Sequence, residues 1–85
     1  MWKDRLKQLP LGYSEVSYNG KKYGVVKTNF NNGKSIKLYA DELGGNDFIS
    51  LNYYMTLKDE LLKPCEMSVQ KVIHFLEKHK LKEKG

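Results

Sequence analysis

The chain has 85 residues, a single cysteine and a formal net charge of +5. One cysteine excludes a disulfide within the chain, and no apolar run approaches the roughly twenty residues that a membrane-spanning helix needs. The charged start of the sequence, with Lys3, Asp4 and Arg5, is unlike a secretion signal. We therefore expect one cytosolic domain over residues 1–85, without a cofactor, whose positive charge favours anionic partners. The basic end, residues 78–85, is a candidate for fraying.

The spacing of apolar residues predicts a helix near each end of the chain. Trp2, Leu6 and Leu9 recur at helical intervals before Pro10, which predicts a short helix over residues 2–8. Ser68 is a good N-cap for a longer amphipathic helix near the C-terminus. The apolar stripe of this second helix is predicted to have Phe75 at its margin and to contain Val69, Val72, Ile73 and Leu76.

Between the helices, alternating residues and turn signals predict an antiparallel sheet. Asn19-Gly20 is the dipeptide that type I′ hairpin turns prefer, and further turns are expected at 31–33, 44–47 and 56–60. Strands are expected over 13–18, 21–30, 35–40 and 48–55, with a weak fifth strand over 61–63. Residues 41–45 form either a loop or a bulged continuation of the third strand. The predicted fold class is α+β: an antiparallel four- to five-stranded β-meander, a C-terminal amphipathic helix on one face and a short N-terminal helix.

Alternation also sorts the strand residues into two faces. The face assigned to the core contains Val16, Tyr18, Val26, Phe30, Ile36, Leu38, Ile49, Leu51 and Tyr53. The opposite face contains Tyr23, Val25, Lys27, Lys37, Tyr39, Phe48, Asn52 and Tyr54, with Lys34 at its rim. This second face mixes aromatic rings with lysines. It is therefore the candidate binding surface.

Aromatic rings and lysines on one sheet surface are typical of proteins that bind single-stranded nucleic acid, because bases stack on rings while lysines contact phosphates. The sequence thus favours a small non-enzymatic binding module. The residues predicted to stack on bases are Tyr23, Tyr39 and Tyr54, and those predicted to contact phosphate are Lys27, Lys34 and Lys37. The alternative is that the same face mediates protein interaction or homodimerisation. A plain solvated surface is the third possibility, since tyrosine is favoured in strands by propensity alone.

The sequence offers little for catalysis or metal binding. Cys65 lies close to Lys63 and to the start of the C-terminal helix, which makes it the possible reactive thiol and leaves a single-cysteine redox protein as a remote alternative. Its other interpretation is a small buried hydrophobic residue. His74 and His79 lie five residues apart on one helix, so they do not share a face and no metal site is expected.

Two segments resemble known families. Residues 42–50 (Glu-Leu-Gly-Gly-Asn-Asp-Phe-Ile-Ser) and 63–67 (Lys-Pro-Cys-Glu-Met) resemble a family of small bacterial proteins of about this length that has no settled activity. Some members of that family carry a methionine-sulfoxide-reductase label, but this chain lacks a Gly-Cys-Phe-Trp catalytic turn and a second cysteine. Residues 48–76 are similar to positive-cofactor-four type single-strand DNA binders, which combine a β-meander with a helix and dimerise. That similarity implies nucleic-acid binding by analogy.

Overall fold

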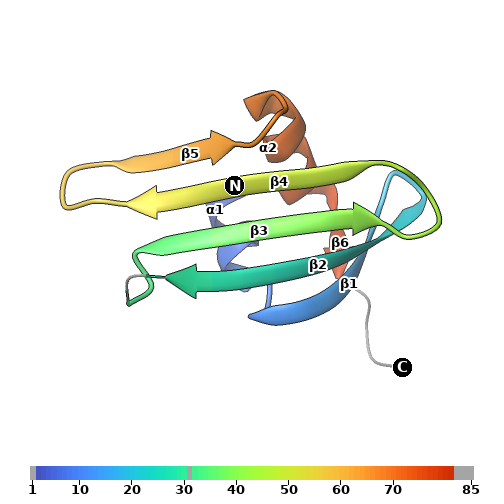
Figure 1. The fold of residues 1–85 in the computed structure, drawn as a ribbon, viewed down its shortest axis with the longest axis horizontal. Helices are drawn as coiled ribbons and strands as arrows, with labels where there is room; N and C mark the ends of the chain where they lie inside the picture. Colours follow the sequence, from blue (N-terminus) through green and yellow to red (C-terminus); the bar gives the residue numbers. More distant parts are fainter. Residues whose placement is uncertain (1, 31, 82–85) are drawn as a thin grey trace.

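The computed structural model describes residues 2–30 and 32–81, which form two helices and six strands (Figure 1). In chain order these are α1 (Trp2–Gln8), β1 (Gly12–Tyr18), β2 (Lys21–Phe30), β3 (Ser35–Glu42), β4 (Phe48–Met55), β5 (Glu60–Pro64), α2 (Val69–Lys78) and β6 (Lys80–Leu81). The α+β class and the antiparallel meander are confirmed. Fraying was expected over residues 78–85, but residues 78–81 contain the end of α2 and β6; residues 82–85 lie outside the described residues.

All six strands form one antiparallel sheet in the order β5-β4-β3-β2-β1-β6. Asn19 and Gly20, with φ values of 52° and 74°, form the tight turn between β1 and β2. Of residues 41–45, for which a loop and a continued third strand were both considered, 41 and 42 continue β3 and the loop follows Glu42. The prediction of four or five strands missed β6, which pairs with β1 at Val16 and Ser17. A strand of two residues is too short to show an alternating pattern.

Both helices lie on the same side of the sheet, behind it in Figure 1, and the core fills the space between them and the sheet. Leu6 and Leu9 from the N-terminal segment are buried together with Val72, Phe75 and Leu76 from α2. Each such side chain, fully buried, contributes roughly 1.5–3 kcal/mol to folding. Neither helix of the described chain has the length and apolar composition that crossing a lipid bilayer requires.

The start of α2 is as predicted, but its buried stripe differs. The Ser68 hydroxyl accepts a hydrogen bond from the amide of Lys71 at 3.2 Å, which caps the first turn. Phe75, expected at the margin, is fully buried, while Val69, expected within the stripe, is exposed. The shift follows from the sheet beneath the helix, where the ring centroids of Tyr18 and Tyr23 lie 4.9 and 5.4 Å from that of Phe75.

A buried lysine fastens α1 to the sheet. The ammonium of Lys27, on β2, donates to the carbonyl oxygens of Leu6, Lys7 and Leu9 at 2.9, 3.2 and 2.8 Å. An ammonium has three protons, so these bonds use all of its donors and satisfy carbonyls that the end of a helix leaves free. Burial lowers the pKa of Lys27 below its ordinary value.

Arginine from α1 in turn closes the end of α2. Arg5 donates through Nε to the carbonyl of Leu76 at 3.3 Å and through its terminal nitrogen to the carbonyl of His79. His79 is buried, with its imidazole stacked on Phe75 and its Nδ1 within 3.0 Å of the Phe75 carbonyl. Burial, with a smaller contribution from Arg5, lowers the pKa of His79. His79, which lies within the basic end of the chain, therefore belongs to the core.

Replacing Lys27 by methionine is expected to lower the free energy of unfolding by about 1–3 kcal/mol, because three helix-end carbonyls lose their donor. Lys37→Met on the neighbouring strand is the matched control, since Lys37 is exposed and surface changes usually stay within about 0.5 kcal/mol. Urea denaturation measures both. If Lys27→Met were as stable as wild type, the free-energy cost of removing the ammonium from water would equal the gain from its three hydrogen bonds.

Acidification from pH 7.5 to pH 5 is expected to destabilise the wild-type fold through His79. As the pH falls, His79 of the unfolded chain binds a proton near the ordinary histidine pKa of about 6.5, whereas His79 of the folded chain binds one only at lower pH. The free energy of unfolding therefore falls by at most about 1.4 kcal/mol per pH unit. His79→Gln should reduce this slope. Val72→Ala, which opens a cavity without removing a titrating group, should keep it. An unchanged slope in His79→Gln would contradict the assignment.

Candidate binding face

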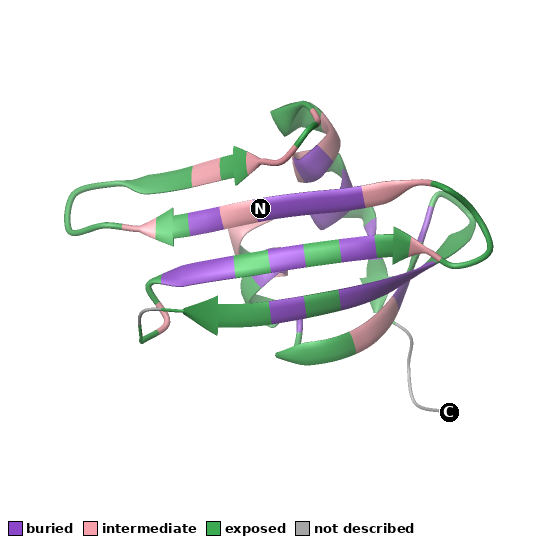
Figure 2. Cartoon of the chain, in the orientation of Figure 1, coloured by how far each residue is buried: buried purple, intermediate pink, exposed green. Residues whose placement is uncertain are grey.

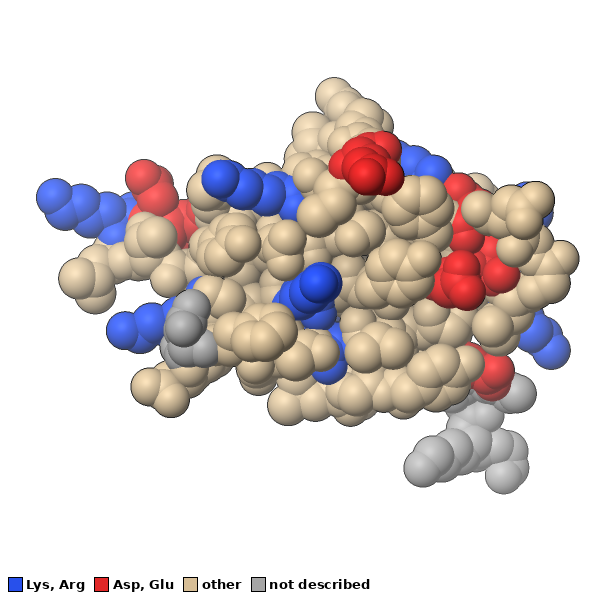
Figure 3. Space-filling view, viewed as in Figure 1, with Lys and Arg blue, Asp and Glu red and all other residues tan. Residues whose placement is uncertain are grey.

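The side of the sheet away from both helices, called the open face here, has exposed rings and aliphatic side chains. Its tyrosines include Tyr13, which is 63% exposed, and Tyr39, which is 43% exposed. Val26, Phe30, Tyr54 and Leu61 are exposed on the same side. From Ile36 to Asp41 of β3 the residues alternate between buried and exposed, as Figure 2 shows. Figure 3 shows the open face, where uncharged atoms cover most of the surface.

The strand register arranges these side chains in rows that cross the sheet. The Phe30 row consists of Phe30, Ser35, Tyr54 and Leu61. The lysine row consists of Thr28, Lys37, Asn52 and Lys63. The tyrosine row consists of Tyr13, Val26, Tyr39 and Ser50. Two rows that carry rings therefore flank one polar row that carries two lysines.

Neighbouring groups hold two of the rings in the tyrosine row. Tyr39 stacks on Phe48, with ring centroids 6.1 Å apart and planes inclined by 21°. Tyr13 lies against the backbone of Gly24, where an added Cβ would come within 2.7 Å of the tyrosine hydroxyl. Glycine at this position thus lets the ring approach the strand closely. Rings held in this way lose less side-chain entropy when a flat ligand stacks on them.

Positive and negative charges occupy different parts of the open face. Lys37 and Lys63 form no ion pair within the part of the chain that the structure describes. The next row beyond the tyrosine row, the acidic row, contains Glu15, Gly24, Asp41 and Phe48. In Figure 3, acidic side chains gather at the right-hand end of the face, where β3 ends and β4 begins, while basic side-chain atoms lie near its centre. An anion is therefore favoured over the lysine row and disfavoured over the acidic row.

The structure brings together only part of the predicted site. Lys37, Tyr39 and Tyr54 lie on the open face, and Lys34 lies in the exposed turn before β3. Tyr23 and Lys27, which were predicted to stack on a base and to contact phosphate, lie on the side that the helices cover and are buried. The predicted face of β2 was therefore wrong: Val25 is also buried, whereas Val26 and Phe30, assigned to the core, are exposed.

The two faces of β2 were exchanged in the prediction, which is equivalent to a one-residue shift in register. The turn between β1 and β2 indicates the correct register. A two-residue turn at Asn19-Gly20 places Tyr18 opposite Lys21 and therefore Val16 opposite Tyr23, on the same face. Because both faces of β2 carry apolar residues, the alternation of residues does not by itself show which face is buried. The same register identifies residues of the open face that the sequence reading did not assign to it: Tyr13, Phe30 and Lys63.

On the covered side, Tyr23 belongs to a polar cluster that ties the β3–β4 loop to α2. Asp47 accepts hydrogen bonds from the Tyr23 hydroxyl and from the Lys71 ammonium, both at 2.7 Å. The bonds from Lys71 and Tyr23 lower the pKa of Asp47, while burial and the bond to Asp47 raise the pKa of Tyr23. Nearby, the Tyr18 hydroxyl is hydrogen-bonded to Nδ1 of His74. These contacts account for the cluster as a structural link.

Cys65 directly follows β5, next to the open face. Its thiol is half-buried, and its sulfur accepts a hydrogen bond from the amide of Asn52 at 3.5 Å. Its own amide donates to the carbonyl of Ser50 at 3.0 Å, which extends the pairing of β4 and β5. Across residues 2–30 and 32–81, no three His, Cys, Asp or Glu side chains are grouped as a metal site would require.

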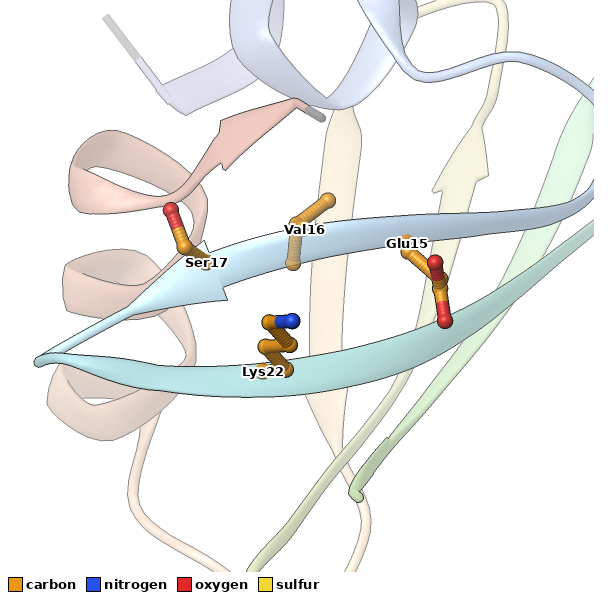
Figure 4. A pocket seen from close by; sticks show the side chains of 4 residues that line it. All are labelled: Glu15, Val16, Ser17 and Lys22. Carbon is orange, nitrogen blue, oxygen red and sulfur yellow. The ribbon is translucent and has the colours of Figure 1, made fainter. Parts of the chain in front are cut away.

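A small hollow is formed by residues of β1 and of the start of β2, near the edge of the sheet that β6 forms (Figure 4). It is lined by Glu15, Val16, Ser17 and Lys22 and has a volume of about 120 Å³. Sites for small organic ligands usually enclose roughly 300–1,000 Å³. The hollow is therefore a weaker candidate for a binding site than the open face.

Comparison of the chain with protein-family models, with curated proteins and with solved structures gives no match. The two resemblances noted in the sequence therefore remain predictions.

Proposed function

We propose that this chain is a non-enzymatic, cytosolic binding module that takes single-stranded nucleic acid on its open face. The observation that supports this most directly is the order of the rows. Exposed rings of the Phe30 row and the tyrosine row flank the lysine row, whose two lysines have no ion-pair partner among the described residues. Rings for bases and cations for phosphates are thus adjacent on one surface.

The chemistry of the face favours single strands over duplexes. Stacking of a base on an aromatic side chain is worth roughly 1–3 kcal/mol and tolerates any base, because every base has a π-face. The bases of a duplex are already stacked on one another, so they cannot lie flat on a sheet surface without being unpaired. The lysines add a salt-dependent attraction for phosphate that does not read sequence.

The position of Lys37 favours an anionic ligand over a second copy of the chain. Its neighbours across the sheet are Thr28 and Asn52, which carry no charge. Along β3 it lies between the two rows that carry rings. A second copy that covered the lysine row with its own lysine row would remove this ammonium from water without bringing it a carboxylate, which is costly. A two-fold axis near the centre of the face would also bring two copies of Lys37 together. A phosphate provides the missing charge.

Tyr39→Ala is expected to weaken the binding of a fluorescent mixed-sequence single strand of about 12 nucleotides by about 5- to 150-fold, since one stacking ring is lost. Lys37→Gln should reduce the slope of log affinity against log salt by about 0.7, because one phosphate contact disappears. Fluorescence anisotropy at several salt concentrations measures both effects. The controls are Tyr23→Phe, which changes only a hydroxyl on the covered side, and Lys78→Gln on α2.

Equal affinities for wild type and Tyr39→Ala, or an affinity that does not respond to salt, would contradict the proposal. A second contrary result would be that wild type binds no oligonucleotide while its mass in light scattering rises with protein concentration, and that Tyr39→Ala has the mass of a monomer. That result would assign the open face to a second copy of the chain, the homodimer that the sequence left as the alternative.

A further inference from the structure

We infer that a bound single strand crosses the β-strands along the lysine row, rather than following their direction, and that the site therefore holds only a few nucleotides. This inference rests on the proposed function and concerns the path of the ligand. It follows from how charge is distributed in the two directions of the open face. Along the lysine row the charges are both positive, whereas along β3 their sign changes from Lys37 to Asp41.

A path parallel to β3 meets acidic side chains. Alternate residues of β3 on the open face run from Ser35 through Lys37 and Tyr39 to Asp41. Asp41 is exposed, and Glu15 lies in the same row. Phosphates following this direction would leave Lys37 and approach the carboxylate of Asp41. The next cation in that direction is Lys22 of β2, which lies beyond the acidic row. Repulsion between the phosphates and the Asp41 carboxylate makes this path unfavourable.

A path across the strands stays within one row that has no carboxylate. The lysine row spans β2 to β5, three interstrand spacings of about 4.8 Å, or about 14 Å in total. Lys37 and Lys63 are two of these spacings apart, so both can reach phosphates of one short strand. Asn52 lies between them and adds a neutral polar group.

The rings lie on both sides of this path. The Phe30 row and the tyrosine row are each two residues from the lysine row along the strands, which is about 6.6 Å. Bases can therefore turn from a central phosphate line toward Tyr54 on one side or Tyr39 on the other. A path of this length accommodates on the order of four nucleotides, the short end of the range known for single-strand-binding folds.

The test uses single strands of 3, 4, 6, 8 and 12 nucleotides and fluorescence anisotropy with the whole protein at several salt concentrations, and affinities for the different lengths are compared at 150 mM salt. The affinity of wild type should reach a plateau at about four to six nucleotides. Lys63→Gln should reduce the salt slope as much as Lys37→Gln does, by about 0.7. Asp41→Asn should change the affinity by less than about twofold, because Asp41 lies four residues from Lys37, beyond the screening length of about 8 Å.

Other results separate this inference from the proposed function. If affinity rises steadily to 12 nucleotides, Lys63→Gln has no effect and Asp41→Asn strengthens binding severalfold, the strand follows β3 and the crosswise path is wrong while the function stands. If wild type binds none of the oligonucleotides even at low salt, the proposed function itself fails, and the inference fails with it.

Discussion

The arrangement of this protein depends on one buried ammonium. Lys27 projects from β2 to the covered side and donates to three carbonyl oxygens where α1 ends. A seven-residue helix is too short to persist in water without tertiary support, so this contact, together with the burial of Leu6, fixes where α1 lies. The ammonium gives up its hydration but keeps all of its hydrogen bonds. That exchange makes burial of a lysine tolerable at this position.

The position of α1 then determines the end of α2. Arg5, on α1, donates to the carbonyls of Leu76 and His79, which α2 leaves free at its C-terminus. The chain continues from His79 directly into β6, which pairs with β1 and closes that edge of the sheet. Lys27 and Arg5 thus form a sequence of two capping interactions that runs from the sheet through α1 to α2. Both helices are consequently held on one face.

Placing both helices on one side leaves the other side of the sheet to water. This explains why Tyr13, Phe30, Tyr39 and Tyr54 stay exposed although their strands are central to the fold. Strand propensity alone accounts for a tyrosine in a strand, but it does not account for the order of rings, lysines and acids across the open face. Because that order follows from the strand register, the pairing of strands that builds the core also arranges the candidate site.

The positions of both helices and of five of the six strands could be read from the sequence, because local chemistry sets them: positive φ at Asn19-Gly20, the hydroxyl cap at Ser68 and alternation in β4. Of the six predicted contact residues, Lys34, Lys37, Tyr39 and Tyr54 are exposed as expected, whereas Tyr23 and Lys27 are buried. Tertiary structure decided that difference. Both faces of β2 are apolar enough to enter a core. Which of them is buried depends on the pairing with β1 and on α1, whose carbonyl oxygens accept hydrogen bonds from the Lys27 ammonium. Local pattern reports what a residue prefers, but burial of a lysine or of His79 depends on partners that only the folded chain brings within bonding distance.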